Sequence, residues 1–127
     1  MEHLKQEISK LKYQMSILVS TVDSDKYPVE SLILSMNWDD DDLNDAHDIF
    51  EKYDKKLEAK EEDIKWSAFE QELKNRFNIS YQIVKIIIIA FYKNHQWVDV
   101  CYQYAKAYTC VEFHSLIRDY EQANESL

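Results

Sequence analysis

The sequence contains no glycine among its 127 residues and only one proline, Pro28. Average glycine usage of about 7% would supply roughly nine. The P-loop, the dinucleotide-binding fingerprint and the nucleophile elbow all need glycine, so this absence excludes them. Tight β-hairpins also favour glycine in their turns. Because helix-breaking residues are scarce while Lys, Glu, Leu and Ala are abundant, the composition predicts an all-α protein.

A signal sequence, a long apolar run and a plausible disulfide are also missing. The N-terminus, MEHLKQEISK, has no apolar core, and no apolar run approaches the ~20 residues of a membrane span. Cys101 and Cys110 would lie roughly 13 Å apart on one straight helix, too far to bridge. Reduced thiols are typical of cytosolic proteins. We therefore expect a soluble, cytoplasmic protein.

Basic residues are outnumbered by acidic ones: the sequence has 24 aspartates and glutamates and 15 lysines and arginines, for a net charge of −9. A nucleic-acid backbone is therefore not an expected partner. The excess is local: residues 39–63 hold twelve acidic residues against four lysines. Within this stretch, one helix face is a candidate surface for a partner with a basic surface, although a solvated helix face explains the same residues. The face consists of Asp40, Asp41, Asp45 and Asp48.

Helical periodicity predicts one all-α domain over residues 1–127, a compact bundle of about five to six helices. The expected segments are 1–22, 28–36, 39–58, 66–77, 80–93 and a last helix from about 95, bent or broken at 109–111, with a frayed tail from about 121 to 127. Asp39 and Ser67 are the candidate N-caps of the third and fourth segments.

The stretch 80–93 is the densest apolar run and contains the segment from Ile86 to Phe91. Four consecutive isoleucines could form a buried strand. The longer helical spacing around them, with Ser80 as N-cap, favours a central helix that is apolar all round. Asn94 is the expected helix exit, since Asn tolerates the left-handed conformation.

The first helix has a separate pattern. Its apolar residues follow the 4-3-4-3-4 spacing of a heptad repeat. They are Leu4, Ile8, Leu11, Met15, Leu18 and Val22. Because this seam starts before another element can cover it, we expect a homo-oligomer whose interface contains Leu4, Ile8, Leu11, Met15 and Leu18. An ordinary helix of an internal bundle is the alternative.

Two patterns are typical of metal sites, but neither is complete. Residues 40–51 place four acidic residues and Asn44 at five ligand positions of a calcium-binding loop, but Asp45 replaces the required glycine, and such a loop would interrupt the helical apolar stripe. Cys110 and His114 are four residues apart, whereas a structural zinc site usually has four ligands.

No nucleophile and base are paired in the sequence, since the four histidines are scattered along it. The sequence therefore predicts no catalytic residue, no cofactor, no metal and no enzymatic activity. The tyrosines Tyr102, Tyr104 and Tyr108 could mark a binding surface. The simpler interpretation is that they line the bundle, with hydroxyls at its edge.

The segment from Leu11 to Leu34 resembles the opening of the YhaI-like proteins of Bacillus and its relatives. The matching residues are Leu11, Tyr13, Leu18, Val19, Thr21, Val22, Asp23, Asp25, Tyr27 and Pro28, with weaker similarity through 69–73 to about 105. This chain departs from the pattern by its run 39–42 and by Asn94 in place of a glycine. The resemblance implies an all-α, oligomer-prone fold and no activity, because that family is one of unknown function.

Two functions are compatible with these features. The first is a non-enzymatic scaffold or protein-interaction module that self-associates through the heptad helix. The alternative is an acidic inhibitor, antitoxin-like or anti-defence and of host or phage origin, whose Asp-rich face masks a basic surface of a partner protein.

Overall fold

The computed structural model describes residues 1–125, and every regular element in that range is helical. The elements are α1 (Glu2–Thr21), α2 (Pro28–Met36), α3 (Asp40–Glu58), α4 (Trp66–Phe77), α5 (Tyr81–Lys93), α6 (Val98–Ala107), the 3-10 turn η1 (Val111–Phe113) and α7 (His114–Glu125). The all-α prediction is confirmed. The described residues form seven α-helices instead of five to six, because the expected break near 109–111 fully separates α6 from α7.

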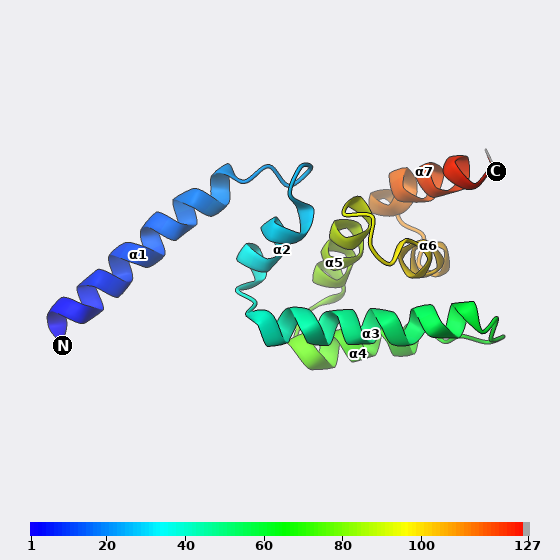
Figure 1. Ribbon diagram of the computed structural model, residues 1–127, viewed down its shortest axis with the longest axis horizontal. Coiled ribbons are helices and arrows are strands. Elements are labelled where there is room, and N and C mark those ends of the chain that lie inside the picture. Colours follow the sequence, from blue (N-terminus) through cyan, green and yellow to red (C-terminus); the bar gives the residue numbers. More distant parts are fainter. Residues whose placement is uncertain (126–127) are drawn as a thin grey trace.

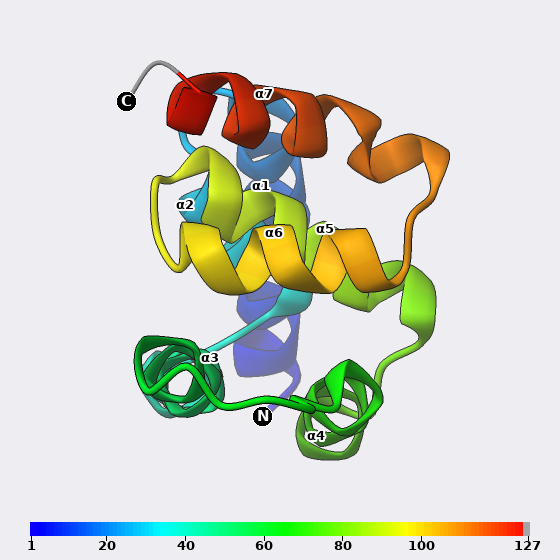
Figure 2. The same ribbon diagram turned by 90° about the vertical axis from the view of Figure 1, so that its right-hand side faces the viewer.

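The helices form a layered body with one projecting arm. Figure 1 shows α1 extending away from the body, with α2 returning beside it toward the start of α3. In the end-on view of Figure 2, α3 and α4 lie side by side as one layer, α5 and α6 form the middle layer, and α7 covers the opposite side. The body therefore contains α2–α7, and α1 lies outside it.

The central helix α5 organises the core, as the sequence predicted. It packs against α2, α4 and α6, and Phe91 meets Phe50 of α3 edge to face at a ring distance of 4.8 Å. Its buried residues are Val84, Lys85, Ile87, Ile88, Ala90 and Phe91. The prediction of a helix apolar and buried all round was wrong in one respect: Ile86 is 50% exposed, because no neighbouring helix covers that side of α5.

Without glycine, other residues adopt the left-handed backbone conformation that ends helices. Asn37 (φ 57°) ends α2 and Asn78 (φ 52°) ends α4. Asn94 ends α5 as expected, but the expected left-handed conformation was wrong, since its φ is −86°. His95 (φ 60°) and Trp97 (φ 52°) turn the chain instead.

The predicted cap of α3 is confirmed, and that of α4 was wrong. The Asp42 backbone N–H donates to the Asp39 carboxylate at 2.9 Å, and the Asp39 N–H donates to the Asp42 carboxylate at 3.0 Å, which completes a capping box. Ser67 lies inside α4, whose N-cap is Lys65. Ser80 is the N-cap of α5 as predicted, although its side chain makes no capping hydrogen bond.

At the C-terminus, α7 continues through Glu125. The described part of the tail that was expected to fray is therefore helical, and residues 126–127 lie outside the described range. Over residues 1–125, no helix combines the length and the apolar character needed to cross a membrane.

Candidate functional site

The arm α1 is a helix with an apolar seam that its own chain leaves uncovered. No residue of α1 is buried. The five seam residues proposed for an interface, Leu4, Ile8, Leu11, Met15 and Leu18, are between 44% and 61% exposed. Scattered exposed apolar side chains are ordinary, but a contiguous row of them marks an interaction surface. From Leu4 to Leu18 the seam extends along about 21 Å of helix.

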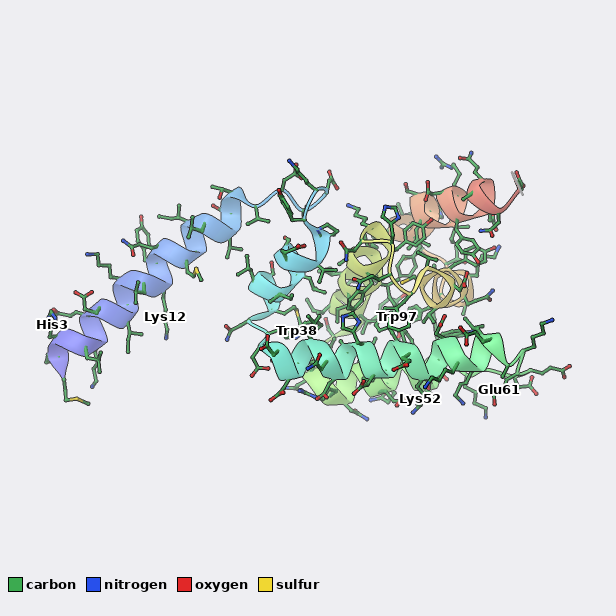
Figure 3. All side chains as sticks on the ribbon, viewed as in Figure 1. His3, Lys12, Trp38, Lys52, Glu61 and Trp97 are labelled. Carbon is green, nitrogen blue, oxygen red and sulfur yellow. The ribbon has the colours of Figure 1, made fainter. Side chains whose placement is uncertain are left out.

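The seam forms one wall of a groove between α1 and α2. Ile8, Leu11 and Met15 line the groove from α1, and Leu34 and Trp38 line it from α2 and the residues that follow. In Figure 3, Lys12 and Trp38 are labelled on the two sides of the space between the arm and the body. The groove is therefore an apolar surface made by two helices, of which only one was predicted to take part.

The body holds the second wall of the groove in place. The ring of Trp38 stacks on Phe77 of α4 at a centroid distance of 4.7 Å. Leu32, on the other face of α2, is buried in the core. Because α2 is anchored in this way, the side chains that it presents to the groove are fixed relative to the body. Ile33 is partly buried, packs against the core and also lines the groove.

The connection between α1 and α2 is also tied to the body. The Asp23 carboxylate accepts the backbone N–H of Asp25 at 2.9 Å, which orders the turn. The Lys93 ammonium, at the end of α5, donates to the Asp25 carboxylate at 2.7 Å. This hydrogen bond lowers the pKa of Asp25. These contacts link the turn between α1 and α2 to the end of α5.

The predicted acidic face of α3 is divided in the structure. Asp45 accepts a hydrogen bond from the Arg76 guanidinium of α4 at 2.5 Å, and Arg76 also bonds Asp42 at 2.9 Å. Asp45 therefore joins two helices of the body. Asp40, Asp41 and Asp48 make no ion pair within residues 1–125. These three remain available as an acidic surface.

The tyrosines connect helices through their hydroxyl groups. Five of them donate to carboxylates at 2.5–2.6 Å: Tyr53 to Glu72, Tyr92 to Asp119, Tyr102 to Glu121, Tyr104 to Glu70, and Tyr120 to Asp99. Burial and the Asp99 carboxylate together raise the pKa of Tyr120 to about 12. The arrangement matches the interpretation that tyrosines line the bundle with hydroxyls at its edge, and it leaves these hydroxyls occupied.

The described residues contain no converged set of metal ligands. The segment proposed as a calcium loop is the continuous first half of α3. Within residues 1–125, no three His, Cys, Asp or Glu side chains are grouped so as to hold a metal ion. Cys101 is buried in α6, and Cys110 is partly exposed between α6 and η1.

His47 has a structural partner. The Trp97 indole N–H donates to its Nδ1 at 2.9 Å, and burial lowers the pKa of His47. This hydrogen bond joins α3 to the turn before α6, so His47 acts here as a packing residue.

These features define a small all-α protein whose most distinctive surface is an exposed amphipathic arm with an adjoining groove. The chain belongs to the DUF1878 family, described as a protein of unknown function, whose model matches residues 1–101. The match includes all of α1 and α2, so both walls of the groove lie within the family region. No curated protein matches the chain, and no solved structure matches it.

Proposed function

We propose that this protein is a non-enzymatic helical interaction module that self-associates through α1. The observation that carries the proposal is the exposed heptad seam on an arm with no buried residue. A 20-residue helix in isolation is only marginally stable in water, and most helical stability in proteins comes from packing of an apolar face. A second copy of α1 would supply that packing.

The test is the mass of the full chain in solution, measured by multi-angle light scattering over a range of concentrations. We expect an oligomer for the native chain and a folded monomer for Ile8→Glu/Leu11→Glu, because both new carboxylates would lie in the seam. The matched control is Gln6→Glu/Tyr13→Glu, which adds the same charge on the opposite face of α1 and should remain oligomeric. A native chain that is monomeric at micromolar concentration contradicts the proposal.

Within the DUF1878 family, we infer that the chain is a YhaI-like protein, on the basis of the segment from Leu11 to Leu34 quoted above. This assignment adds no activity. It predicts that a YhaI-like protein has the same projecting arm and the same Asp23-centred turn before Pro28, which a crystal structure of such a protein would test. A cytoplasmic location stays part of this proposal and is supported by two cysteines that form no disulfide.

The alternative function is an acidic inhibitor that masks a basic surface of a partner. It is favoured by the three carboxylates of α3 that lack an ion pair within the described range, Asp40, Asp41 and Asp48. Asp45 is omitted from this test, because changing it would release Arg76 and disturb the α3–α4 contact.

We expect Asp40→Asn/Asp41→Asn/Asp48→Asn to lose capture of a basic protein from cell extract if this function is correct. The control, Glu58→Gln/Glu62→Gln/Asp63→Asn, removes the same charge from the end of α3 and the following loop and should retain capture. Equal capture by both variants would eliminate the acidic inhibitor.

A further inference from the structure

The residues at alternate seam positions of α1 differ in shape. In the heptad nomenclature, Leu4, Leu11 and Leu18 occupy position d of α1, whereas Ile8 and Met15 occupy position a. Val22 continues the spacing but lies just past the end of the helix, in extended conformation. Leucine at d with a β-branched residue at a favours a parallel, two-stranded coiled coil. Ile8 follows this rule, and Met15 is flexible enough to pack in either site.

The charged residues beside the seam indicate the same orientation. Glu7 is at position g and Lys12 is at position e, five residues later. In a parallel, in-register pair, position g of one helix lies beside the following e position of the other, so Glu7 would face Lys12 of the second copy. In a fully overlapped antiparallel pair, position e faces e, and the two Lys12 ammonium groups would repel each other.

Neither charge is used within the chain itself. Glu7 and Lys12 take part in no ion pair within residues 1–125. Lys12 lines the groove between α1 and α2. The two groups are therefore exposed and available to pair between copies.

The groove also shows how far the contact extends. On α1 it is lined by seam residues and by the e positions Lys12 and Val19, so α2 flanks the seam on its e side. A helix placed on the seam would therefore also reach Ile33 and Leu34 of α2. Leu34 is 38% exposed although it belongs to a helix anchored in the core.

We propose that the groove is filled by α1 of a second copy, which runs parallel to and in register with the first. Two α1 helices then form the centre of a four-helix assembly with one α2 on each side, related by a two-fold axis along the arms. The proposal deepens the self-association described above and depends on it. It adds the orientation of the helices, the pairing of Glu7 with Lys12, and the participation of α2.

Charge exchange tests the pairing. Glu7→Lys and Lys12→Glu each place two like-charged contacts in the dimer and should raise its dissociation constant roughly five- to tenfold at low salt. The double variant Glu7→Lys/Lys12→Glu restores opposite charges only in the parallel arrangement and should return close to the native value. Additive weakening in the double variant would overturn the pairing.

Disulfide trapping tests the orientation independently. In a Cys110→Ser background, Leu4→Cys should form a disulfide with itself on mild oxidation, because the two positions face each other only in a parallel pair. In a fully overlapped antiparallel pair, the two Leu4 sites would be roughly 27 Å apart, whereas Ile8 of one copy would face Leu18 of the other. A mixture of Ile8→Cys and Leu18→Cys chains that forms only the mixed disulfide would overturn the parallel orientation while leaving self-association intact.

The role of α2 requires a third variant. Leu34→Asp should raise the dissociation constant at least roughly tenfold, since an interface charge must be desolvated. The control Glu30→Gln lies on an exposed part of α2 outside the groove and should have no effect. An unchanged dissociation constant for Leu34→Asp, or a trimeric mass for the native chain, contradicts this assembly. A monomeric native chain contradicts both this inference and the proposed function.

Discussion

Leu11 and Leu73 provide a direct test of whether the arm is a folding element or an assembly element. Leu73 is fully buried between the helices of the body, whereas Leu11 is 61% exposed on the arm. Replacing a buried leucine by alanine costs about 2–5 kcal/mol of unfolding free energy. Replacing a leucine that is mostly exposed should change the free energy of unfolding by only a few tenths of a kcal/mol, because the higher helix propensity of alanine partly offsets the small burial that is lost.

If the protein associates through α1, Leu11→Ala should also weaken the dimer, whereas Leu73→Ala should not. Burying a leucine side chain is worth about 1.5–3 kcal/mol. With 61% of the side chain still available for burial, each copy would contribute on the order of 1–2 kcal/mol. Two copies per dimer therefore lose about 2–4 kcal/mol in Leu11→Ala, which corresponds to a dissociation constant raised by roughly 30- to 1,000-fold.

The assay is urea unfolding of the native chain, Leu11→Ala and Leu73→Ala at protein concentrations well below and well above the native dissociation constant. At low concentration, Leu11→Ala should match the native chain and Leu73→Ala should be strongly destabilised. At high concentration, a gap should also open for Leu11→Ala, because association stabilises only the folded state that binds. A loss above 2 kcal/mol for Leu11→Ala at every concentration would refute the reasoning, since it would mean that Leu11 packs within its own chain.

Two further predictions concern groups inside the body. Burial and the Trp97 hydrogen bond favour neutral His47, so its pKa in the native state lies below the unfolded value of about 6.5. The unfolded state therefore binds more protons than the native state. The free energy of unfolding should then fall as pH drops from about 7.5 toward the native pKa. Between pH 8 and pH 6, the free energy of unfolding measured in urea should fall less for His47→Gln than for the native chain. An equal fall for both chains would contradict this prediction. Burial raises the pKa of the Cys101 thiol. A maleimide should therefore label only Cys110 in the folded protein and both thiols in urea. Labelling of both thiols without urea would contradict this prediction and show that α6 opens.

The local features of this fold were predictable because they depend on neighbouring residues. The periodicity of α1, the acidic capping box at Asp39 and the apolar run of α5 each express an interaction within a few residues of the chain. The break before α7 was predictable for the same reason, since the apolar phase changes there. Each of these features can be predicted without knowing which helices pack together.

The contacts that position the candidate site were not predictable, because their partners are far apart in the sequence. Arg76 and Asp45 are 31 residues apart, and Lys93 and Asp25 are 68 apart. No periodic pattern indicates such pairs. The first pair removes Asp45 from the predicted free acidic face, and the second links the turn after the arm to α5.

The groove shows the same limit. Heptad spacing identified the α1 wall, since the seam is a property of one helix. The α2 wall was missed because periodicity gave Leu34 no role, and only the packing of Leu32 into the core shows that Leu34 points away from it. The apolar residues of a surface built by two helices are therefore visible in the sequence, but their pattern cannot be distinguished from that of core residues.

The arm and the acidic face, treated above as competing functional surfaces, are compatible in a parallel assembly. Two parallel α1 helices carry both bodies at the same end of the pair, so two copies of the Asp40, Asp41 and Asp48 surface would be displayed together. If a partner has two basic sites, the second contact becomes intramolecular and can raise overall affinity by about 10²–10⁴.

This predicts a specific comparison. Surface plasmon resonance against an immobilised basic partner should show that Ile8→Glu/Leu11→Glu, which leaves the acidic face intact, dissociates at least tenfold faster than the native chain. Asp40→Asn/Asp41→Asn/Asp48→Asn should instead lose binding in either assembly state. Equal dissociation rates for the native chain and the arm variant would show that the arm assembles the protein for a purpose unrelated to the acidic face. The two surfaces would then have to be treated as separate sites.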